Sequence, residues 1–357
     1  MAFKAKVAML VSSLRSRKFR YALIAVAFVA VLPLFVRSEY VVGQVLTLMI
    51  IFAIYASSWN LLAYSGQGSL GHAAFLGIGG FTSALLAVRS GLPPVIGLFL
   101  GSLLSAGIGF LIGLACVRLK AWFLAMVTFG FSVIAVTIIS QFDDLFGGMI
   151  GFPTPTVVPQ ILPFYYATLA IAAVSIGVIF IVMKSKLGLA FKAIRENELE
   201  AKMIGINTGK YRLIAFVIST FFAGLAGGLY AESQQFIQIS IFEPYYSFLP
   251  LIMAVIGGLS TIEGPIIGSI ILVYIDSLRL SFYLPEPWSL LFPGVSNVGP
   301  PLQMVGLGLL LIVIVIFLPK GITSLLRKAY NYLRPYLRKV YDYFREDTSK
   351  AKKIEGK

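Results

Sequence analysis

The sequence predicts an all-α, polytopic helical membrane protein with about ten transmembrane helices. Its mean hydropathy is +0.90, and 58% of its residues are hydrophobic whereas only 12% are charged. Such a composition lies far outside the range of soluble domains. Long uncharged runs recur along the chain, and several reach the ~20 residues that a helix needs to cross the hydrocarbon core. They are too uniformly apolar for barrel strands, which alternate over about 10 residues, so we expect helices.

The uncharged runs give the predicted spans in chain order. These runs are Tyr21–Val36, Tyr40–Ala63, Leu92–Val117, Ala121–Ser140, Ile161–Met183, Leu213–Ala231, Pro244–Ile262, Gly264–Ile275 and Pro287–Pro319. The basic residues before Tyr21 resemble the start of a signal peptide, but the absence of a small-residue cleavage site predicts an uncleaved first span. Pro244–Ile262 and Gly264–Ile275 form either two short crossings or one crossing and a re-entrant piece. The expected count is therefore nine to eleven.

The distribution of positive charge predicts the orientation of these spans. The formal net charge is +14, and with ten crossings most Lys and Arg residues fall on one side, which by the positive-inside rule is the cytoplasm. This places both termini and the segment 184–212 in the cytoplasm. We therefore predict a basic cytoplasmic N-terminus (1–20), a membrane region (21–319) and a basic amphipathic tail (320–357) that lies on the anionic inner leaflet. Charge distributed in this way indicates topology and not nucleic-acid binding.

Cofactor sites are not expected in this chain. Cys116 is the only cysteine, so neither a disulfide nor a thiolate metal cluster can form within the chain. The sequence has no G-x-x-x-x-G-K-[ST] loop for nucleotide phosphates. We therefore do not expect this chain itself to bind ATP.

Two glycine-rich stretches suggest an internal repeat. GQGSLGHAAFLGIGG begins at Gly66 and GGLSTIEGPIIGSII begins at Gly257; at one fixed offset Ser69 matches Ser260 and Gly77 matches Gly268. Both stretches follow an uncharged span and open an inner turn that leads back into the membrane. Duplicated, glycine-interrupted segments point to a transport path, whereas small residues that simply let helices pack closely are the plainer interpretation.

The segment KAIRENELEAKMIGINTGK (192–210) is charged although uncharged spans flank it on both sides. Leu199, Met203 and Ile206 follow i, i+4, i+7 spacing and form one apolar stripe. Glu198 and Lys202 make an i, i+4 pair with the acid on the favourable N-terminal side. These features predict a short amphipathic cytoplasmic helix.

The end of this helix and its acidic face bear on its partner. Gly205 is a natural helix stop, and Asn207 can cap the helix that follows. Helices that lie on lipid headgroups are mostly basic on their polar face, whereas this one carries Glu196, Glu198 and Glu200. A mixed-sign face beside an apolar stripe favours a cytoplasmic protein partner.

Four stretches of the chain resemble one known family. SKLGLAFKAIRENELEAKMIGINTGKYRLIAFVISTFFAGLAGGLYA (185–231), NLLAYSGQGSLGHAAFLGIGGFTSALLA (60–87), RLKAWFLAMVTFG (118–130) and IGGLSTIEGPIIGS (256–269) are similar to permease subunits of ABC importers for branched-chain amino acids. The resemblance is closer to the LivM type than to the LivH type. It covers most of residues 40–320 in the expected order.

This resemblance implies the partners and the role of the charged segment. The expected assembly contains a LivH-like second permease, two ABC ATPase subunits that bind ATP and Mg²⁺, an extracytoplasmic substrate-binding protein, and the lipids of the cell membrane. Leu, Ile and Val are the expected cargo, with urea, amides and other amino acids as alternatives. The segment 192–210 would then be the loop that contacts the ATPase, with the coupling residues Arg195, Glu196, Asn197, Glu198, Glu200, Ala201, Gly205, Ile206 and Asn207.

The two glycine-broken turns supply the candidate residues of the translocation path: Ser69, His72, Ser260 and Glu263. Ser69 and His72 could also form the dyad of a membrane hydrolase, but the G-x-S-x-G elbow is missing. Glu263 is expected at a cytoplasmic turn where water solvates it, and Asp276 lies near the outer end of its span. Intramembrane acids are functional candidates by default. A single-chain secondary transporter or channel is the main rival, and the coupling-like loop disfavours it.

Overall fold

The computed structural model describes residues 17–36, 38–116, 121–148, 150–154 and 160–277, together with short pieces between residues 305 and 332. The predicted span Pro287–Pro319 and the predicted amphipathic tail at 320–357 lie largely outside these described residues. The same holds for most of the predicted basic N-terminus.

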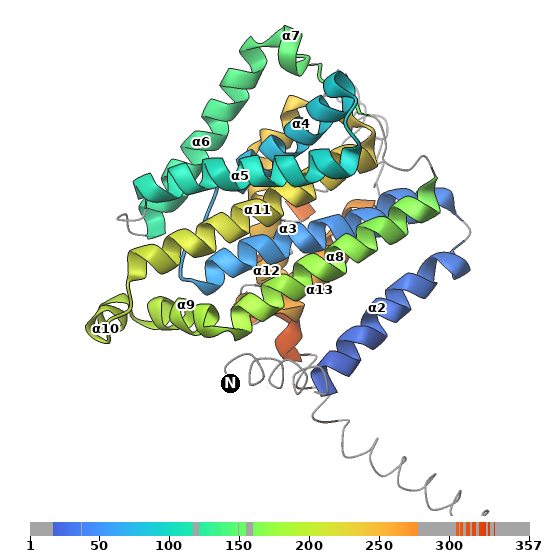
Figure 1. The fold of residues 1–357 in the computed structure, drawn as a ribbon. Helices are drawn as coiled ribbons and strands as arrows, with labels where there is room; N and C mark the ends of the chain where they lie inside the picture. The colour runs from blue at the N-terminus through green and yellow to red at the C-terminus, as the bar shows by residue number, and fades with distance from the viewer. Residues whose placement is uncertain are drawn as a thin grey trace, which may run out of the picture.

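Helices make up nearly all of the described chain (Figure 1). The α-helices are α2 (Arg17–Phe35), α3 (Thr47–Tyr64), α4 (His72–Ser90), α5 (Pro94–Cys116), α6 (Ala121–Gln141), α7 (Asp143–Phe146), α8 (Ile161–Lys184), α9 (Lys186–Glu196), α10 (Glu198–Met203), α11 (Thr208–Gln234), α12 (Pro244–Gly257) and α13 (Glu263–Ser277). A π-helix, η1 (Val41–Leu46), precedes α3, and a 3-10 helix, η2 (Ile239–Phe242), precedes α12. Two strands of two residues, β1 (Phe152–Pro153) and β2 (Phe236–Ile237), pair antiparallel.

Six of the described helical segments are long and apolar enough to cross a membrane. They are 41–64, which joins η1 and α3, and the apolar parts of α4, α5, α6, α8 and α11. The all-α, multi-pass prediction is therefore confirmed, but the count of about ten spans is not. α12 has only 14 residues, which span about 21 Å at 1.5 Å per residue, less than the ~30 Å of the hydrocarbon core.

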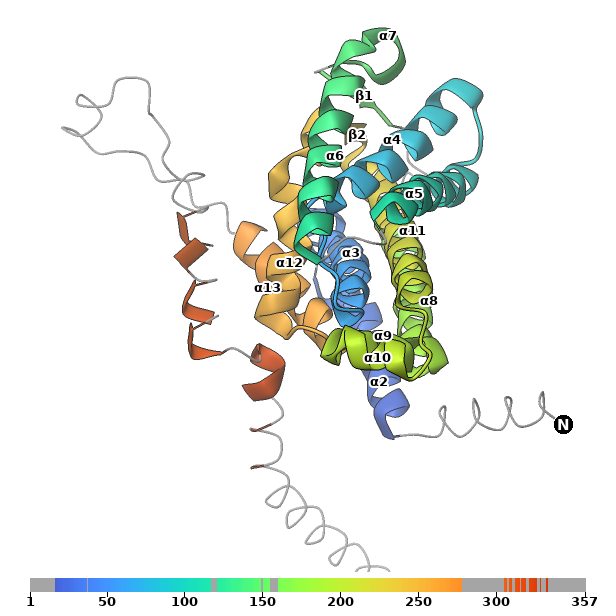
Figure 2. The ribbon, with the colours of Figure 1, turned by 90° about the vertical axis from the view of Figure 1, so that its left-hand side faces the viewer.

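α3 is the central helix of the bundle. Its side chains are buried from Ile50 to Leu62, and α8, α11, α12 and α13 all pack against it. Figure 2 shows α3 between the α12–α13 pair on one side and α8 and α11 on the other. In contrast, only 28% of the apolar window of α6 and of α8 is buried, as expected for helices that face lipid.

α4, α5 and α11 pack together through very small residues. A Cβ added at Gly79 of α4 would lie 2.1 Å from the carbonyl oxygen of Gly224 in α11. Likewise, a Cβ at Gly227 would lie 1.8 Å from the carbonyl oxygen of Leu76. Close backbone approach of this kind is how helices associate when lipid removes the hydrophobic driving force. In these three helices, the small residues thus let the helices pack closely.

The loops gather at two opposite ends of the bundle. At one end, the turn after α3 meets α11 and the turn after α12: Gln67 donates to the carbonyl of Arg212 (3.0 Å) and Asn60 donates to the carbonyl of Thr261 (2.6 Å). At the other end, β1 pairs with β2, and Arg89 donates to the backbone carbonyls of Asp144 and Leu145. In Figure 2, α9 and α10 lie at the lower end and α7 and the strands at the upper end.

The helix boundaries agree with the offset of the predicted repeat. At the offset that aligns Gly66 with Gly257, His72 aligns with Glu263, and these two residues are the first of α4 and α13. Both turns lie at the same end of the bundle, since each contacts the end of α3. The repeat itself stays a prediction.

Candidate functional site

The charged segment forms two short helices at the end of α8. Ser185 ends α8 and begins α9, where its hydroxyl accepts a hydrogen bond from the Leu187 amide (3.1 Å). α9 then runs for 11 residues and α10 for six before α11 returns into the bundle. The sequence predicted one amphipathic helix here, and the structure breaks it at Asn197.

α9 is anchored to the bundle along one face. Phe191 is fully buried and its ring packs edge-on against Tyr211 of α11. Gly188 lies so close to the end of α8 that an added Cβ would come within 2.0 Å of the Met183 carbonyl oxygen. Near its end, the Arg195 guanidinium lies over the Tyr64 ring, 5.3 Å from its centroid. α9 therefore connects α8, α3 and α11.

Asn197 separates α9 from α10 by a capping interaction that the sequence analysis overlooked. The residue is extended (φ −157°), and its side-chain oxygen accepts hydrogen bonds from the amides of Leu199 and Glu200. Its side-chain nitrogen donates to the Glu200 carboxylate at 2.7 Å. Asn at the cap with Glu three residues later is a recognised start signal for a helix, and it is visible in the sequence as N-E-L-E.

The end of α10 explains why a glycine stands at position 205, four residues after Ala201. Gly205 has φ +83°, which favours glycine. The Ile206 amide donates to the Ala201 carbonyl and the Gly205 amide to the Lys202 carbonyl, both at 3.0 Å; this is the Schellman pattern of a helix end. Ala201 is buried beneath this turn. Asn207 then caps α11 by accepting from the Lys210 amide, as predicted.

Glu198 fastens α10 to α11. Its carboxylate pairs with Lys202 (2.9 Å), as predicted, and also with Arg212 (2.8 Å). Partial burial alone would raise the pKa of Glu198, but the hydrogen bond from Lys202 and the charge of Arg212 together hold it below its ordinary value of 4.5. Glu198 thus holds the helix in place, whereas the prediction placed it on the outer polar face.

The outer face of α10 is apolar and open to solvent. Leu199 is 70% exposed, Met203 87% and Ile204 74%. Ile206, predicted to belong to the stripe, is half-buried, so Ile204 takes its place. Glu196 and Glu200 are exposed beside this face, and Arg195 pairs with Glu196 at 3.0 Å. An exposed apolar patch with a charged rim, which we call the α10 face (Leu199, Met203 and Ile204), is typical of a protein-interaction site.

Two of the predicted path residues, Ser69 and His72, are fully buried. The His72 Nε2 lies 3.0 Å from the Ser58 hydroxyl, and the ring stacks on Tyr55. In the described part of the chain, the Ser69 hydroxyl and the His72 Nδ1 have no hydrogen-bond partner. His72 therefore contacts Ser58 and not Ser69, which removes the support for a hydrolase dyad.

The other two predicted path residues lie in the turn after α12 and at the start of α13. The Ser260 amide donates to the Asn60 side chain at 2.7 Å, and Ser260 has φ +59°. Glu263 is exposed at the start of α13. The structure therefore brings all four residues to one end of the bundle, and none of the four lines the cavity described next.

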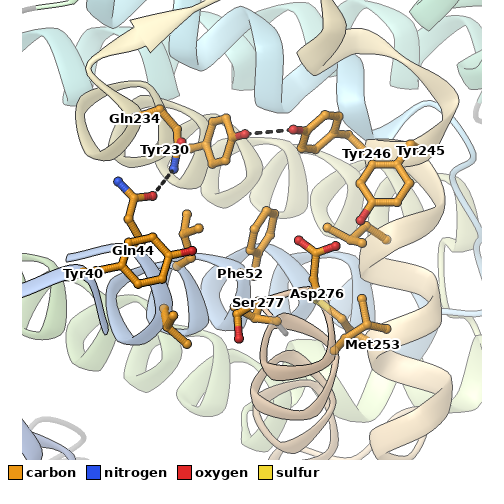
Figure 3. A pocket seen from close by; sticks show the side chains of 15 residues that line it. Tyr40, Gln44, Phe52, Tyr230, Gln234, Tyr245, Tyr246, Met253, Asp276 and Ser277 are labelled. Carbon is orange, nitrogen blue, oxygen red and sulfur yellow. Dashed lines mark hydrogen bonds between the residues drawn. The ribbon is translucent and has the colours of Figure 1, made fainter. Parts of the chain in front are cut away.

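A partly open cavity of about 220 Å³ lies at the other end of the bundle, away from the four predicted path residues. It is lined by the start of α3 with η1, the end of α11, the start of α12 and the end of α13 (Figure 3). Its polar lining consists of Tyr40, Gln44, Tyr230, Gln234, Tyr245, Tyr246, Asp276 and Ser277. The sequence pointed to Asp276 alone, because only the fold brings the other side chains together.

Comparison with known proteins adds an independent view of the chain. Residues 41–316 match the family described as branched-chain amino acid transport system / permease component. The high-affinity branched-chain amino acid transport system permease protein LivM of Escherichia coli is 28% identical over 84% of this chain and 75% of its own length. LivM of Salmonella typhimurium is also 28% identical, over 80% of this chain and 70% of its own length. A probable LivH permease of Methanocaldococcus jannaschii is 25% identical over 56% of this chain and 64% of its own.

No solved structure gives a significant match to the chain. The family match spans well over half of the chain, includes α3 to α13, and agrees with the multi-pass helical fold. This protein therefore belongs to the family of branched-chain amino acid transport system permease components.

Proposed function

We propose that this chain is one of the two membrane permeases of an ATP-driven importer for branched-chain amino acids. LivM and LivH permeases are among its relatives, which supports a pair of unlike permeases. Two ATPase subunits would bind the cytoplasmic end and an extracytoplasmic binding protein would deliver Leu, Ile or Val. The chain itself contributes the membrane passage and no nucleotide site, since the sequence lacks a phosphate-binding loop.

The α10 face is the observation that carries this proposal. α9 is fixed to α3, α8 and α11, whereas α10 presents Leu199, Met203 and Ile204 to solvent. An apolar face on a helix that is joined to a rigidly anchored helix can transmit a displacement of its partner to the spans behind it. Because α9 touches three spans at once, a movement of the ATPase would reach α3, the central helix of the bundle.

The proposed orientation follows from the positive charge. The end that carries α9 and α10 also carries Lys184, Lys186, Lys192, Arg195, Lys202, Lys210 and Arg212, and this bias favours the cytoplasm. The end with α7 and the β1–β2 pair would face the binding protein. Both termini would be cytoplasmic in the ten-span arrangement.

Reconstitution tests the proposal. The chain, a LivH-type permease, the two ATPases and the binding protein would be placed in vesicles, and uptake of labelled leucine followed. We expect ATP-dependent uptake that requires every component, and no ATP hydrolysis by this chain alone. Leucine uptake by this chain without the ATPases, or hydrolysis by the isolated chain, would overturn the proposal.

A further inference from the structure

The cavity at the end of the bundle opposite α10 is lined by two chemically different sets of side chains. The polar set includes Gln44, Tyr230, Gln234, Tyr246 and Asp276. The apolar set includes Leu48, Phe52, Leu249, Met253 and Val273. Small-molecule sites are mostly apolar with a few placed polar groups that fix the ligand's orientation.

Hydrogen bonds position the polar groups. The Tyr230 and Tyr246 hydroxyls are 2.8 Å apart and point toward one another (Figure 3). Each hydroxyl has one proton, so when one donates across the pair the other proton is directed elsewhere. The Gln234 amide donates to the Gln44 oxygen at 3.3 Å, which leaves the Gln44 NH₂ group available as a donor. The tyrosine pair and Gln44 therefore offer O–H and N–H donors to an anion.

Asp276 supplies the opposite charge. Its carboxyl group points into the cavity, toward the side that Tyr245 and Tyr246 occupy (Figure 3). Asp276 and the tyrosine pair lie on different helices, α13 for the acid and α11 and α12 for the tyrosines. A ligand between them would meet a carboxylate on one side and neutral donors on the other. This pattern complements a zwitterion, which carries an ammonium and a carboxylate on adjacent atoms.

The volume of the cavity favours a small ligand. About 220 Å³ is below the ~300–1,000 Å³ of clefts for drug-sized ligands. A short aliphatic side chain would face Phe52, Leu249 and Met253, where burial is favourable. An amino acid therefore fits better than a nucleoside or a sugar.

We propose that this cavity is a binding site for the α-amino acid on its passage through the permease. The Asp276 carboxylate binds the ammonium group, the Tyr230–Tyr246 pair donates to the carboxylate, and the apolar lining residues contact the side chain. This inference rests on the proposed import function and adds the residues that select an amino acid over an uncharged cargo such as urea.

Substitution at Asp276 tests the site in the complete assembly in vesicles, with leucine-loaded binding protein at saturation. A hydrogen bond to a charged group contributes about 1.5–3 kcal/mol, which corresponds to a change of about tenfold or more. We expect Asp276→Asn to lower the rate of leucine uptake at least about tenfold. Asp276→Glu, which keeps the charge, should retain most of the uptake. Glu39→Gln is the matched control, because this acid is exposed just before η1 and does not line the cavity, and it should leave uptake unchanged.

Tyr246→Phe provides a second, milder variant that removes one hydroxyl and keeps the ring. It should lower uptake by about threefold or more, whereas Tyr274→Phe, on the exposed side of α13, should have no effect. Co-purification of the ATPases with each variant reports assembly, and if Asp276→Asn does not assemble, Tyr246→Phe decides the matter. Uptake within twofold of wild type for Asp276→Asn and Tyr246→Phe overturns this inference and leaves the import function intact. Failure of the wild-type assembly to take up leucine would instead overturn the proposed function.

Discussion

α9 and α10 are neighbours in one loop, yet they differ in what their side chains contact. α9 buries Gly188, Ala190, Phe191 and Ile194 against the bundle, whereas Ala201 is the buried residue of α10. The exposed large apolar residues of the loop are concentrated on α10 and at the end of it. Only Asn197 stands between the two helices.

The difference separates two tasks that one helix would have to combine. A helix that transmits movement must be fixed to the spans, and α9 is fixed by close backbone approach and a buried aromatic ring. A helix that binds a partner must leave its apolar side chains free, and α10 does so. Substitutions in α9 should therefore act on the fold, and substitutions in α10 should act on association.

The broadest effect is expected for Gly188→Val in α9, because it should lower both stability and assembly. A Cβ there would approach the Met183 carbonyl oxygen to 2.0 Å, and backbone cannot move as a side-chain tip can. Overpacking of this kind costs about 1–3 kcal/mol, occasionally more. We expect a lower melting temperature of the isolated, detergent-purified chain and loss of the assembly. An unchanged melting temperature would show that α9 is not anchored as described.

The double variant Leu199→Glu with Met203→Glu should act on association alone. Both side chains are exposed, so the chain should insert and melt as the wild type does. Anchor residues of an interface contribute about 2 kcal/mol or more each, so co-purification of the ATPases should be lost. Leu189→Glu is the matched control, because Leu189 is 68% exposed but belongs to α9. If Leu189→Glu disrupts association as strongly, the distinction between α9 and α10 fails.

Gly205→Val should have an intermediate effect. Nothing lies within 4 Å of an added Cβ, so the cost comes from φ +83° alone, about 1–2 kcal/mol. We expect weaker association with the ATPases and reduced uptake, with normal insertion. Gly205→Asn should be nearly neutral, because Asn tolerates left-handed backbone. An equal loss of association in both variants would show that the added side chain, and not the backbone strain at φ +83°, weakens binding of the ATPases.

The smallest effect is expected for Glu198→Gln. The Glu198 carboxylate is partly exposed, so its pairs with Lys202 and Arg212 contribute about 0.2–1 kcal/mol. The folded pKa is lowered, so this contribution is present above the ordinary value of 4.5 and is lost as pH falls through the lowered pKa. Amide hydrogen exchange in α10 should therefore differ between wild type and Glu198→Gln near pH 7 and converge in acid. A difference that persists in acid would contradict the ion-pair account.

Much of the fold could be predicted from the sequence, because lipid leaves long uncharged runs no alternative to helix. The stop at Gly205 and the cap at Asn207 were also predictable, since each depends on one residue and its neighbours. The break at Asn197 was missed, although its signal is local. The inward pairing of Glu198 could not be predicted, because Arg212 comes close only once α11 has folded back along α9. The cavity was missed for the same reason: Gln44, Tyr230 and Tyr246 come from three separate segments.

Chemical labelling at position 203 tests the central claim most directly. Cys116 is buried, so a Cys116→Ala background allows a single cysteine to be placed by Met203→Cys, with Asp144→Cys at the opposite end as the control. The account predicts that a water-soluble maleimide labels position 203 in the permeases alone and is excluded from it when the ATPases are bound, while labelling at position 144 stays the same. Equal labelling of position 203 with and without the ATPases would show that the α10 face is not their contact surface.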